Sequence, residues 1–157
     1  MKEYPSCVID KDCHPVPIIQ GVDARYCLTV TINEQYKNVL TYIMMNPSKA
    51  DMEQSDATVN KVICFAASTA NDEYKIGKVQ ILNLFALYEP KSRSLQKLLD
   101  QVMEYPIKYQ GNYMENRKNI NDVISNSKYI VLAWGDVPRE CQQKLITRKL
   151  NIFTIVS

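Results

Sequence analysis

Histidine, tryptophan and glycine are scarce in this sequence, with one, one and four of them among 157 residues. Long hydrophobic runs are also missing, and none approaches the ~20 residues that a membrane-spanning helix needs. The first residues lack the apolar core of a signal peptide. We therefore expect a soluble, cytoplasmic protein that does not use a membrane as a partner.

An excess of charge of either sign is absent as well. Charged residues make up 23% of the chain, and the formal net charge is +2. This near balance neither requires nor excludes nucleic acid as a partner, because a local basic patch can exist within a balanced total. Hydrophobic residues make up 46%, which is enough for a core, and the length fits a single domain.

The five cysteines are scattered and odd in number, which favours reduced thiols. Cys7, Cys13 and His14 lie close together and could hold a metal with a fourth ligand. Their spacing fits no standard zinc motif, so we expect no metal. The cysteines with apolar neighbours, which we expect in the core, are Cys27, Cys64 and Cys141.

The hydrophobic periodicity predicts the element order β-β-α-β-α-α-β-α-β. The expected strands are residues 26–32, 38–45, 79–84, 129–133 and 151–156. The expected helices are residues 56–70, a helix capped by Ser92 or Ser94 that carries Leu95 to Val102, residues 112–125 with Met114, Ile120 and Ile124 facing inward, and residues 138–149. Residues 105–111 are expected to form a non-helical break between two helices.

This order predicts an α/β three-layer sandwich. Its mostly parallel sheet of about five strands would carry helices on both faces. The first two strands are expected to pair as an antiparallel hairpin at the edge. Residues 1–23, interrupted by Pro5, Pro15 and Pro17, are expected to form an irregular arm, and residues 24–157 a single domain.

Three apolar segments end in polar or aromatic residues, which indicates a binding site at the carboxyl ends of the strands. Together they supply amides, a hydroxyl, carboxylates and aromatic rings, but no histidine or cysteine. This set suits a planar ligand such as a nucleobase, and not a thiol protease or zinc hydrolase. The candidates are Asn46, Pro47, Ser48, Asp51 and Asp56 after the second strand, Asn83, Phe85 and Tyr88 after the third, and Trp134, Gly135 and Asp136 after the fourth.

Each candidate also has a structural interpretation, and both remain open at this point. Asn46-Pro47 could be a turn in which the Asn side chain bonds its own backbone. Asp56 could cap a helix, and Gly135 could permit a tight turn. Trp134 could belong to the core. A buried Asn83 must be satisfied either by neighbouring backbone or by a ligand.

Several of these segments occur in an order that resembles the DUF1643 family of uncharacterised bacterial and phage proteins. The resemblance runs from residue 25 to the end of the sequence. The matching segments are Arg25-Tyr26-Cys27-Leu28, Ile43-Met44-Met45-Asn46-Pro47-Ser48-Lys49-Ala50-Asp51, Ser55-Asp56-Ala57-Thr58, Asn83-Leu84-Phe85-Ala86, Glu115-Asn116 and Ala133-Trp134-Gly135.

The DUF1643 motifs in turn are similar to those of the uracil-DNA glycosylase superfamily. This similarity implies that Asn46 orients a catalytic water, Asn83 reads a base edge and Phe85 stacks on the base. No cofactor is implied. The full set of candidate residues is Asn46, Asp51 and Asp56 for catalysis, the two carboxylates as possible bases, and Pro47, Ser48, Asn83, Phe85, Asn116, Trp134 and Gly135 for ligand binding.

Members of the family usually continue past the last strand into a segment with a His-Pro pair. No such segment follows the last strand expected here, and the only histidine, His14, lies in the N-terminal arm. Losing such a group removes roughly 2.7–4 kcal/mol of transition-state stabilisation, by analogy with an oxyanion-hole donor. Lys49 or Arg139 could supply the missing charge.

Two functional hypotheses follow. The first is a domain that interacts with a nucleotide or nucleic acid, single-stranded or with a flipped base, and that acts as an N-glycosidase. The second is a non-catalytic binding protein, encoded by a phage, that captures a nucleotide-like ligand or a host protein.

Overall fold

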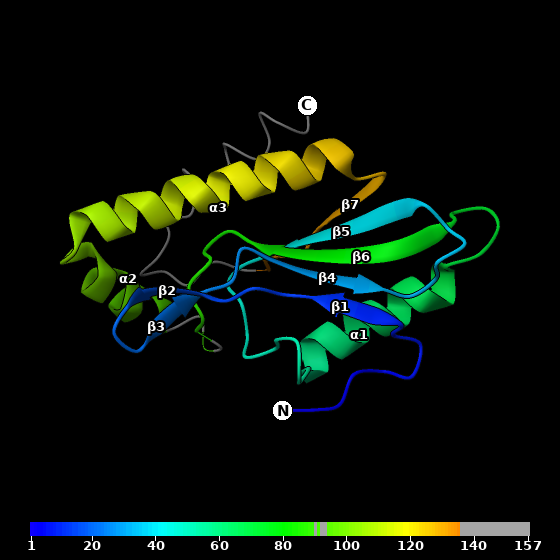
Figure 1. Ribbon diagram of the computed structural model, residues 1–157, viewed down its shortest axis with the longest axis horizontal. Helices are drawn as coiled ribbons and strands as arrows, with labels where there is room; N and C mark the ends of the chain where they lie inside the picture. Colours follow the sequence, from blue (N-terminus) through cyan, green and yellow to red (C-terminus); the bar gives the residue numbers. More distant parts are fainter. Residues whose placement is uncertain (90, 92–93, 136–157) are drawn as a thin grey trace.

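The computed structural model describes residues 1–89, 91 and 94–135, which form a layer of helix, a sheet and a second layer of helices (Figure 1). The strands are β1 (Asp10–Asp12), β2 (Val16–Ile19), β3 (Val22–Ala24), β4 (Cys27–Thr31), β5 (Asn38–Met44), β6 (Ile76–Asn83) and β7 (Tyr129–Leu132). The helices are α1 (Ala57–Thr69), α2 (Leu95–Met103) and α3 (Pro106–Asn126).

The central sheet has five strands in the order β1-β4-β6-β5-β7. Strands β6, β5 and β7 are parallel, whereas β4 is antiparallel to both β6 and β1, so the sheet is mixed. Helix α1 covers one face, and α3 covers the other, with α2 beside it (Figure 1). The α/β class and the helices on both faces are thereby confirmed.

The alternation of side chains along β5 explains the two layers of core. Successive strand residues point to opposite faces of a sheet. Tyr42 accordingly packs in the cluster that contains Val59 and Ile63 of α1, while Ile43 packs in the cluster that contains Ile120 and Ile124 of α3. A strand that is apolar on both faces must be central, and β5 lies between β6 and β7.

The predicted hairpin between the first two main strands is wrong, because β6 lies between β4 and β5. Strand β6 is buried along most of its length and gains a neighbour on each side in this position. The connection from β4 to β5 crosses the start of β6 at Gly77. The Gly77 carbonyl accepts hydrogen bonds from the amides of Ile32 and Asn33, at 2.9 and 3.1 Å.

The N-terminal arm, expected to be irregular, contains three short strands. Strand β1 extends the sheet, pairing Asp10 with Thr31. Strands β2 and β3 form a separate antiparallel pair. Prolines are tolerated in such strands because edge positions leave one side of the backbone without ladder bonds. The arm therefore belongs to the folded structure and completes the antiparallel side of the sheet.

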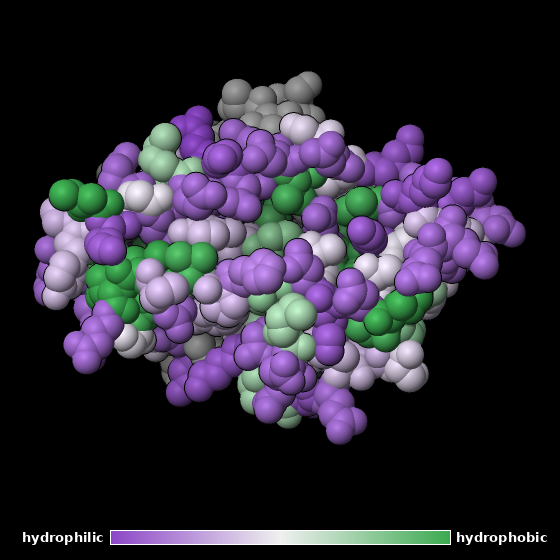
Figure 2. Space-filling model, in the orientation of Figure 1, coloured by the Kyte–Doolittle hydropathy of each residue, from purple (hydrophilic) through white to green (hydrophobic). Residues whose placement is uncertain are grey.

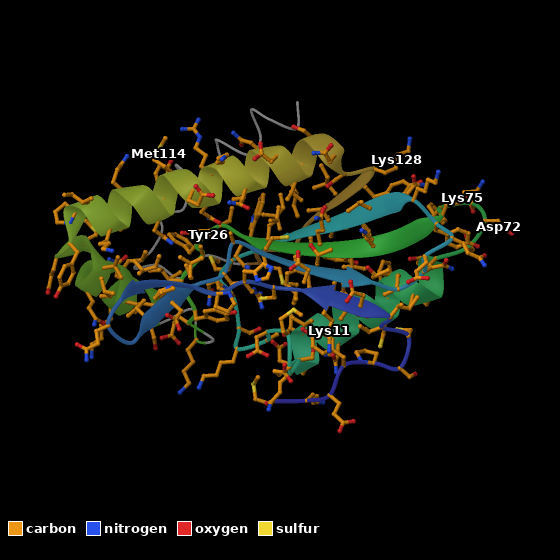
Figure 3. The ribbon with its side chains drawn as sticks, viewed as in Figure 1. Lys11, Tyr26, Asp72, Lys75, Met114 and Lys128 are labelled. Atoms are coloured by element: carbon orange, nitrogen blue, oxygen red, sulfur yellow. The ribbon has the colours of Figure 1, made fainter. Side chains whose placement is uncertain are left out.

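Helix α3 begins at Pro106, six residues earlier than the sequence predicts, so the break between α2 and α3 is confined to Glu104 and Tyr105. Proline suits the first turn of a helix because its missing N–H has no partner there. Met114, expected to face inward, is 52% exposed and projects from the outer side of α3 (Figure 3). The buried positions are instead Asn112, Asn116, Ile120 and Ile124.

Helix α1 begins directly after Asp56, for which the sequence left a capping role open. The Asp56 carboxylate accepts hydrogen bonds from the amides of Thr58 at 2.7 Å and Val59 at 3.0 Å. These bonds satisfy two of the amide groups that a helix N-terminus leaves without partners. Ser94, the residue before α2, makes no such side-chain bond.

This difference gives a matched pair of variants for stability measurements. Asp56→Ala is expected to lower the free energy of unfolding by about 1 kcal/mol, because two amides lose their acceptor. Ser94→Ala is expected to change it by less than about 0.5 kcal/mol. Urea denaturation of both proteins checks the prediction, and equal effects at the two positions would contradict it.

The cysteines are distributed differently from the prediction. Cys7, Cys13, Cys27 and Cys64 are free thiols, but Cys64 is exposed on α1 and Cys13 is buried. Ile63 and Ala66 belong to the buried face of the helix, whereas Cys64 and the neighbouring Phe65 lie outside that face. Cys141, Arg139, Asp136, the expected helix 138–149 and the expected strand 151–156 lie outside the described residues.

The surface seen in Figure 2 is mostly hydrophilic, with hydrophobic side chains in separate areas. The most exposed large hydrophobic side chain is Ile107, in the first turn of α3. Within residues 1–89, 91 and 94–135, no helix has the length and apolar character needed to cross a membrane.

Candidate functional site

One edge of the sheet brings together the ends of four strands. The parallel strands β5, β6 and β7 all end there, with Met44 opposite Asn83 and Ile43 opposite Leu132. Because β4 is antiparallel, its first residue Cys27 lies opposite Leu82 at the same edge. The connections after β5 and β6 lead to helices on opposite faces (Figure 1), and α/β sheets bind ligands at such a point.

A cavity of about 190 Å³ lies at this edge, and we call it the strand-end pocket. Polar and apolar residues both line it. Its lining residues are Arg25, Met44, Met45, Asn46, Ser48, Thr58, Val59, Asn83, Ala133 and Trp134. Residues that follow three of the strands therefore line one cavity together.

Asn83 is the most unusual group in the pocket. Its side chain is 0% exposed, and neither Oδ1 nor Nδ2 has a hydrogen-bond partner. Buried polar side-chain atoms in proteins usually have partners. The sequence left open whether neighbouring backbone groups form hydrogen bonds with the Asn83 side chain. The structure contains no such hydrogen bonds among the residues it describes.

Asn116 holds the backbone at the end of β6 and does not line the pocket. Its Nδ2 donates to the carbonyl oxygens of Asn83 at 3.0 Å and Leu84 at 3.2 Å. The side chain is 2% exposed, so these are buried hydrogen bonds. Asn112 and Asn116 are both buried, because α3 packs over the sheet there. Asn116 thus positions Asn83 through its main chain.

The loop after β5 is tied to its surroundings by side-chain hydrogen bonds. Asn46 Nδ2 donates to the carbonyl oxygen of Glu89, which joins this loop to the loop after β6. Ser48 Oγ donates to the Asp56 carboxylate. Asn46 and Ser48 both line the strand-end pocket, so two of the predicted site residues reach it with defined orientations.

The two acidic candidates and Pro47 are not among the described residues that line the pocket. Asp51 Oδ1 accepts from the amides of Glu53 and Gln54, both at 2.9 Å, and so shapes its own turn. Asp56 caps α1 and reaches the pocket only through Ser48. Pro47 is buried, and its carbonyl accepts from the amide of Glu89.

Of the aromatic candidates, Trp134 lines the pocket and Phe85 does not. Phe85 is 1% exposed within the core cluster that includes α2, and its amide donates to the carbonyl of Met45. Its ring is therefore part of the core. Trp134 is half-buried, and Gly135, which follows it, has a φ of 65° that favours glycine. Tyr88 lies near Arg25.

Arg25 is a pocket residue that reasoning from residue types missed. Among the residues that the structure describes, it is the largest fully buried side chain, at 1% exposed. Nη1 donates to the carbonyl oxygen of Ala50 at 2.6 Å, and the guanidinium carbon lies 5.7 Å from the centre of the Tyr88 ring. Arginine is rarely buried without a charged partner. The available signal was its place just before β4, the antiparallel strand that begins at the site.

Titratable groups around Arg25 are kept in their neutral forms. Burial raises the pKa of the Tyr88 phenol, with the nearby Cys13 adding to the effect. Burial also raises the pKa of the Cys13 thiol, and it raises the pKa of Tyr4 to about 12. Tyr4 Oη donates to the carbonyl of Asp51 and Tyr88 Oη to that of Ala50, so both phenols act as donors.

A metal site at Cys7, Cys13 and His14 is not formed. His14 is exposed and pairs with Asp12, whereas Cys13 is buried. In the described part of the chain, no three His, Cys, Asp or Glu side chains are grouped closely enough to hold a metal ion.

The fold and the strand-end pocket define an α/β protein that carries a small, mixed polar and apolar cavity at the carboxyl ends of its parallel strands. A family model described as "Protein of unknown function (DUF1643)" matches residues 25–157. The chain belongs to this family. The search of curated proteins found no match, and the search of solved structures found none either.

Proposed function

We propose that the strand-end pocket binds a nucleobase, presented by a nucleotide or nucleic acid, and that the Asn83 amide reads its edge. The unpartnered amide of Asn83 carries this proposal. Leaving a buried donor or acceptor unsatisfied costs roughly 1–3 kcal/mol. An Asn side chain offers a donor beside an acceptor, which matches the adjacent donor and acceptor on a base edge.

The size and walls of the pocket support a single ring system as the bound group. The cavity of about 190 Å³ is smaller than the roughly 300–1,000 Å³ of sites for drug-sized ligands. Met44 and Met45 supply apolar surface, and Trp134 supplies an aromatic one. Aromatic and apolar side chains around a few polar groups are the usual environment of an unstacked base.

The enzymatic form of the proposal is hydrolysis of an N-glycosidic bond. Water adds to C1′ of the sugar, the C1′–N bond breaks, and the base leaves with the bonding electrons and takes up a proton. Asn46, whose Nδ2 donates to the Glu89 carbonyl, would orient the water. We also propose that the fold resembles that of the uracil-DNA glycosylases. The support for this is that parallel strands end at the pocket and that helices cover both faces of the sheet.

Binding without turnover is the second candidate. The observation that favours it is the composition of the pocket wall, where no carboxylate or imidazole appears among the described lining residues. Asp51 and Asp56 bond backbone amides instead. General acid–base catalysis needs a titratable group within reach of the reacting atoms.

Replacing Asn83 tests the binding proposal directly. Asn83→Leu keeps the size of the side chain and removes the unpartnered amide. We expect the free energy of unfolding to stay equal or rise by about 1 kcal/mol, and base binding to weaken about 10- to 100-fold. Asn126→Ala, at an exposed amide, should alter neither. A clear loss of stability in Asn83→Leu would show that Asn83 has a structural role and would overturn the proposal.

Mass spectrometry separates the enzymatic form from simple binding. Single- and double-stranded oligonucleotides and free nucleotides, including uracil and modified bases, are incubated with the protein. Loss of a base mass that disappears in Asn46→Ala supports hydrolysis. Unchanged masses for ligands that bind in calorimetry, with binding lost in Asn83→Leu, support the second candidate.

A further inference from the structure

A buried cation without a counter-charge lies beside the base-reading amide. Arg25 and Asn83 both line the strand-end pocket. Arg25 Nε is buried and has no hydrogen-bond partner. The ion pair found in the described part of the chain, between His14 and Asp12, does not involve Arg25. The guanidinium keeps its charge throughout the pH range in which proteins fold.

The groups around Arg25 do not neutralise it. The phenols of Tyr4 and Tyr88 and the thiol of Cys13 are ordinarily protonated at neutral pH, and burial raises their pKa values further. The Asp51 carboxylate bonds the amides of its own turn. Burying an uncompensated charge is strongly unfavourable. A protein that maintains such a charge in a pocket is ready to receive an anion there.

We propose that Arg25 binds the phosphate of the ligand, so that the strand-end pocket takes a mononucleotide in preference to a nucleoside or a nucleic-acid chain. The proposal rests on the function proposed above for the base and adds the anionic group and its receptor. A guanidinium presents several N–H donors in a planar fork that fits phosphate oxygens. Arg25 Nε is the donor with no other partner.

A single charged side chain argues for a small ligand. Proteins that hold nucleic-acid chains use several Lys and Arg side chains along a groove. Arg25 is the only charged residue among the described residues that line the pocket. Helix α1 begins nearby at Ala57, but its Thr58 and Val59 amides already bond Asp56, so the anion is assigned to Arg25 and not to the helix.

The first test compares matched ligands with the intact wild-type protein. Calorimetry at low salt uses the common 5′-mononucleotides, the corresponding nucleosides, inorganic phosphate and a short single-stranded oligonucleotide. We expect at least one mononucleotide to bind about 10- to 100-fold more tightly than its nucleoside, with inorganic phosphate competing. Equal affinity for nucleoside and mononucleotide would overturn the proposal. An oligonucleotide that binds more tightly than every mononucleotide, with a steep salt dependence, would overturn it as well.

The second test removes the charge. Arg25→Met retains an unbranched side chain of similar length, and Lys61→Met, at an exposed cation on α1, is the control. Arg25→Met should lose the preference for mononucleotide over nucleoside and keep a melting temperature equal to or above that of the wild type, because an unpaired buried charge is gone. A lower melting temperature with an unchanged preference would show that Arg25 is structural. Should Arg25→Met fail to fold, Arg25→Lys and the wild-type comparison decide the question.

The two proposals can fail separately. Inorganic phosphate could raise the melting temperature of the wild type but not that of Arg25→Met, while no nucleoside binds. In that case the anion site stands and the base-reading function fails. If nucleosides bind through Asn83 and a phosphate adds no affinity, the base-reading function stands and the role of Arg25 fails.

Discussion

Gly77→Ala is expected to destabilise the protein by about 3 kcal/mol or more, since a methyl group there would overlap backbone that cannot easily move. An added Cβ would lie 1.9 Å from the carbonyl oxygen of Tyr36 and 2.6 Å from that of Asn33. Both oxygens belong to the connection that crosses β6. The Gly77 carbonyl also bonds the amides of Ile32 and Asn33, so strand and connection are fixed to each other.

Gly111→Ala is the matched control for this prediction. Gly111 lies inside α3, and a Cβ there would meet nothing within 4 Å. Alanine should therefore stabilise the helix by up to about 1 kcal/mol. Urea denaturation measures both variants on the same scale. A Gly77→Ala protein that unfolds within about 0.5 kcal/mol of the wild type would contradict the close crossing.

Asn116→Ala is expected to lower the free energy of unfolding by about 2–3 kcal/mol, because two buried carbonyl groups lose their donor. Those carbonyls belong to Asn83 and Leu84, at the end of β6. Binding at the strand-end pocket should weaken together with stability, because the main chain of Asn83 is no longer fixed. Denaturation and ligand calorimetry on the same sample measure the two effects.

Two further variants of α3 sharpen the test. Asn116→Asp keeps the shape of the side chain but places carboxylate oxygens against the two carbonyl oxygens, so it should be at least as damaging as Asn116→Ala. Asn119→Ala removes an amide that bonds only Glu115 of the same helix, and it should change stability by less than about 0.5 kcal/mol. An Asn116→Asp protein as stable as the wild type would contradict the role given to Asn116.

Local patterns predicted the elements that are strongly periodic. The apolar face of α1 and its Asp56 cap, and the strands that end at Met44, Asn83 and Leu132, were all readable from the sequence. The rule that ligands bind beyond the carboxyl ends of parallel strands then placed Asn46, Ser48, Asn83 and Trp134 around one pocket. The positions of these elements follow from side chains with strong local preferences. The rule for ligand binding at strand ends can be applied without knowing the order of the strands in the sheet.

Local patterns failed where partners distant in sequence decide the outcome. The chain from β4 to β5 has the length of a hairpin, yet it crosses β6, and nothing near residue 33 reports the approach of Gly77. The helix start at Pro106 was interpreted as a break, because proline occurs both in the first turn of helices and in the breaks between them. Phe85 was placed in the site by its position after a strand, but that part of the chain continues into the core.

The sequence by itself determined the family, the α/β class and the edge of the sheet at which polar residues gather, because each depends on motifs or on periodicity within a single segment. Only the tertiary structure decided that β6 separates β4 from β5, that Asn116 holds the backbone of Asn83, and that Arg25 is buried in the pocket without a counter-ion. The physical reason is that burial and hydrogen-bond satisfaction depend on which distant segments pack together. An arginine or asparagine has the same local pattern whether it meets water, a partner or an empty pocket.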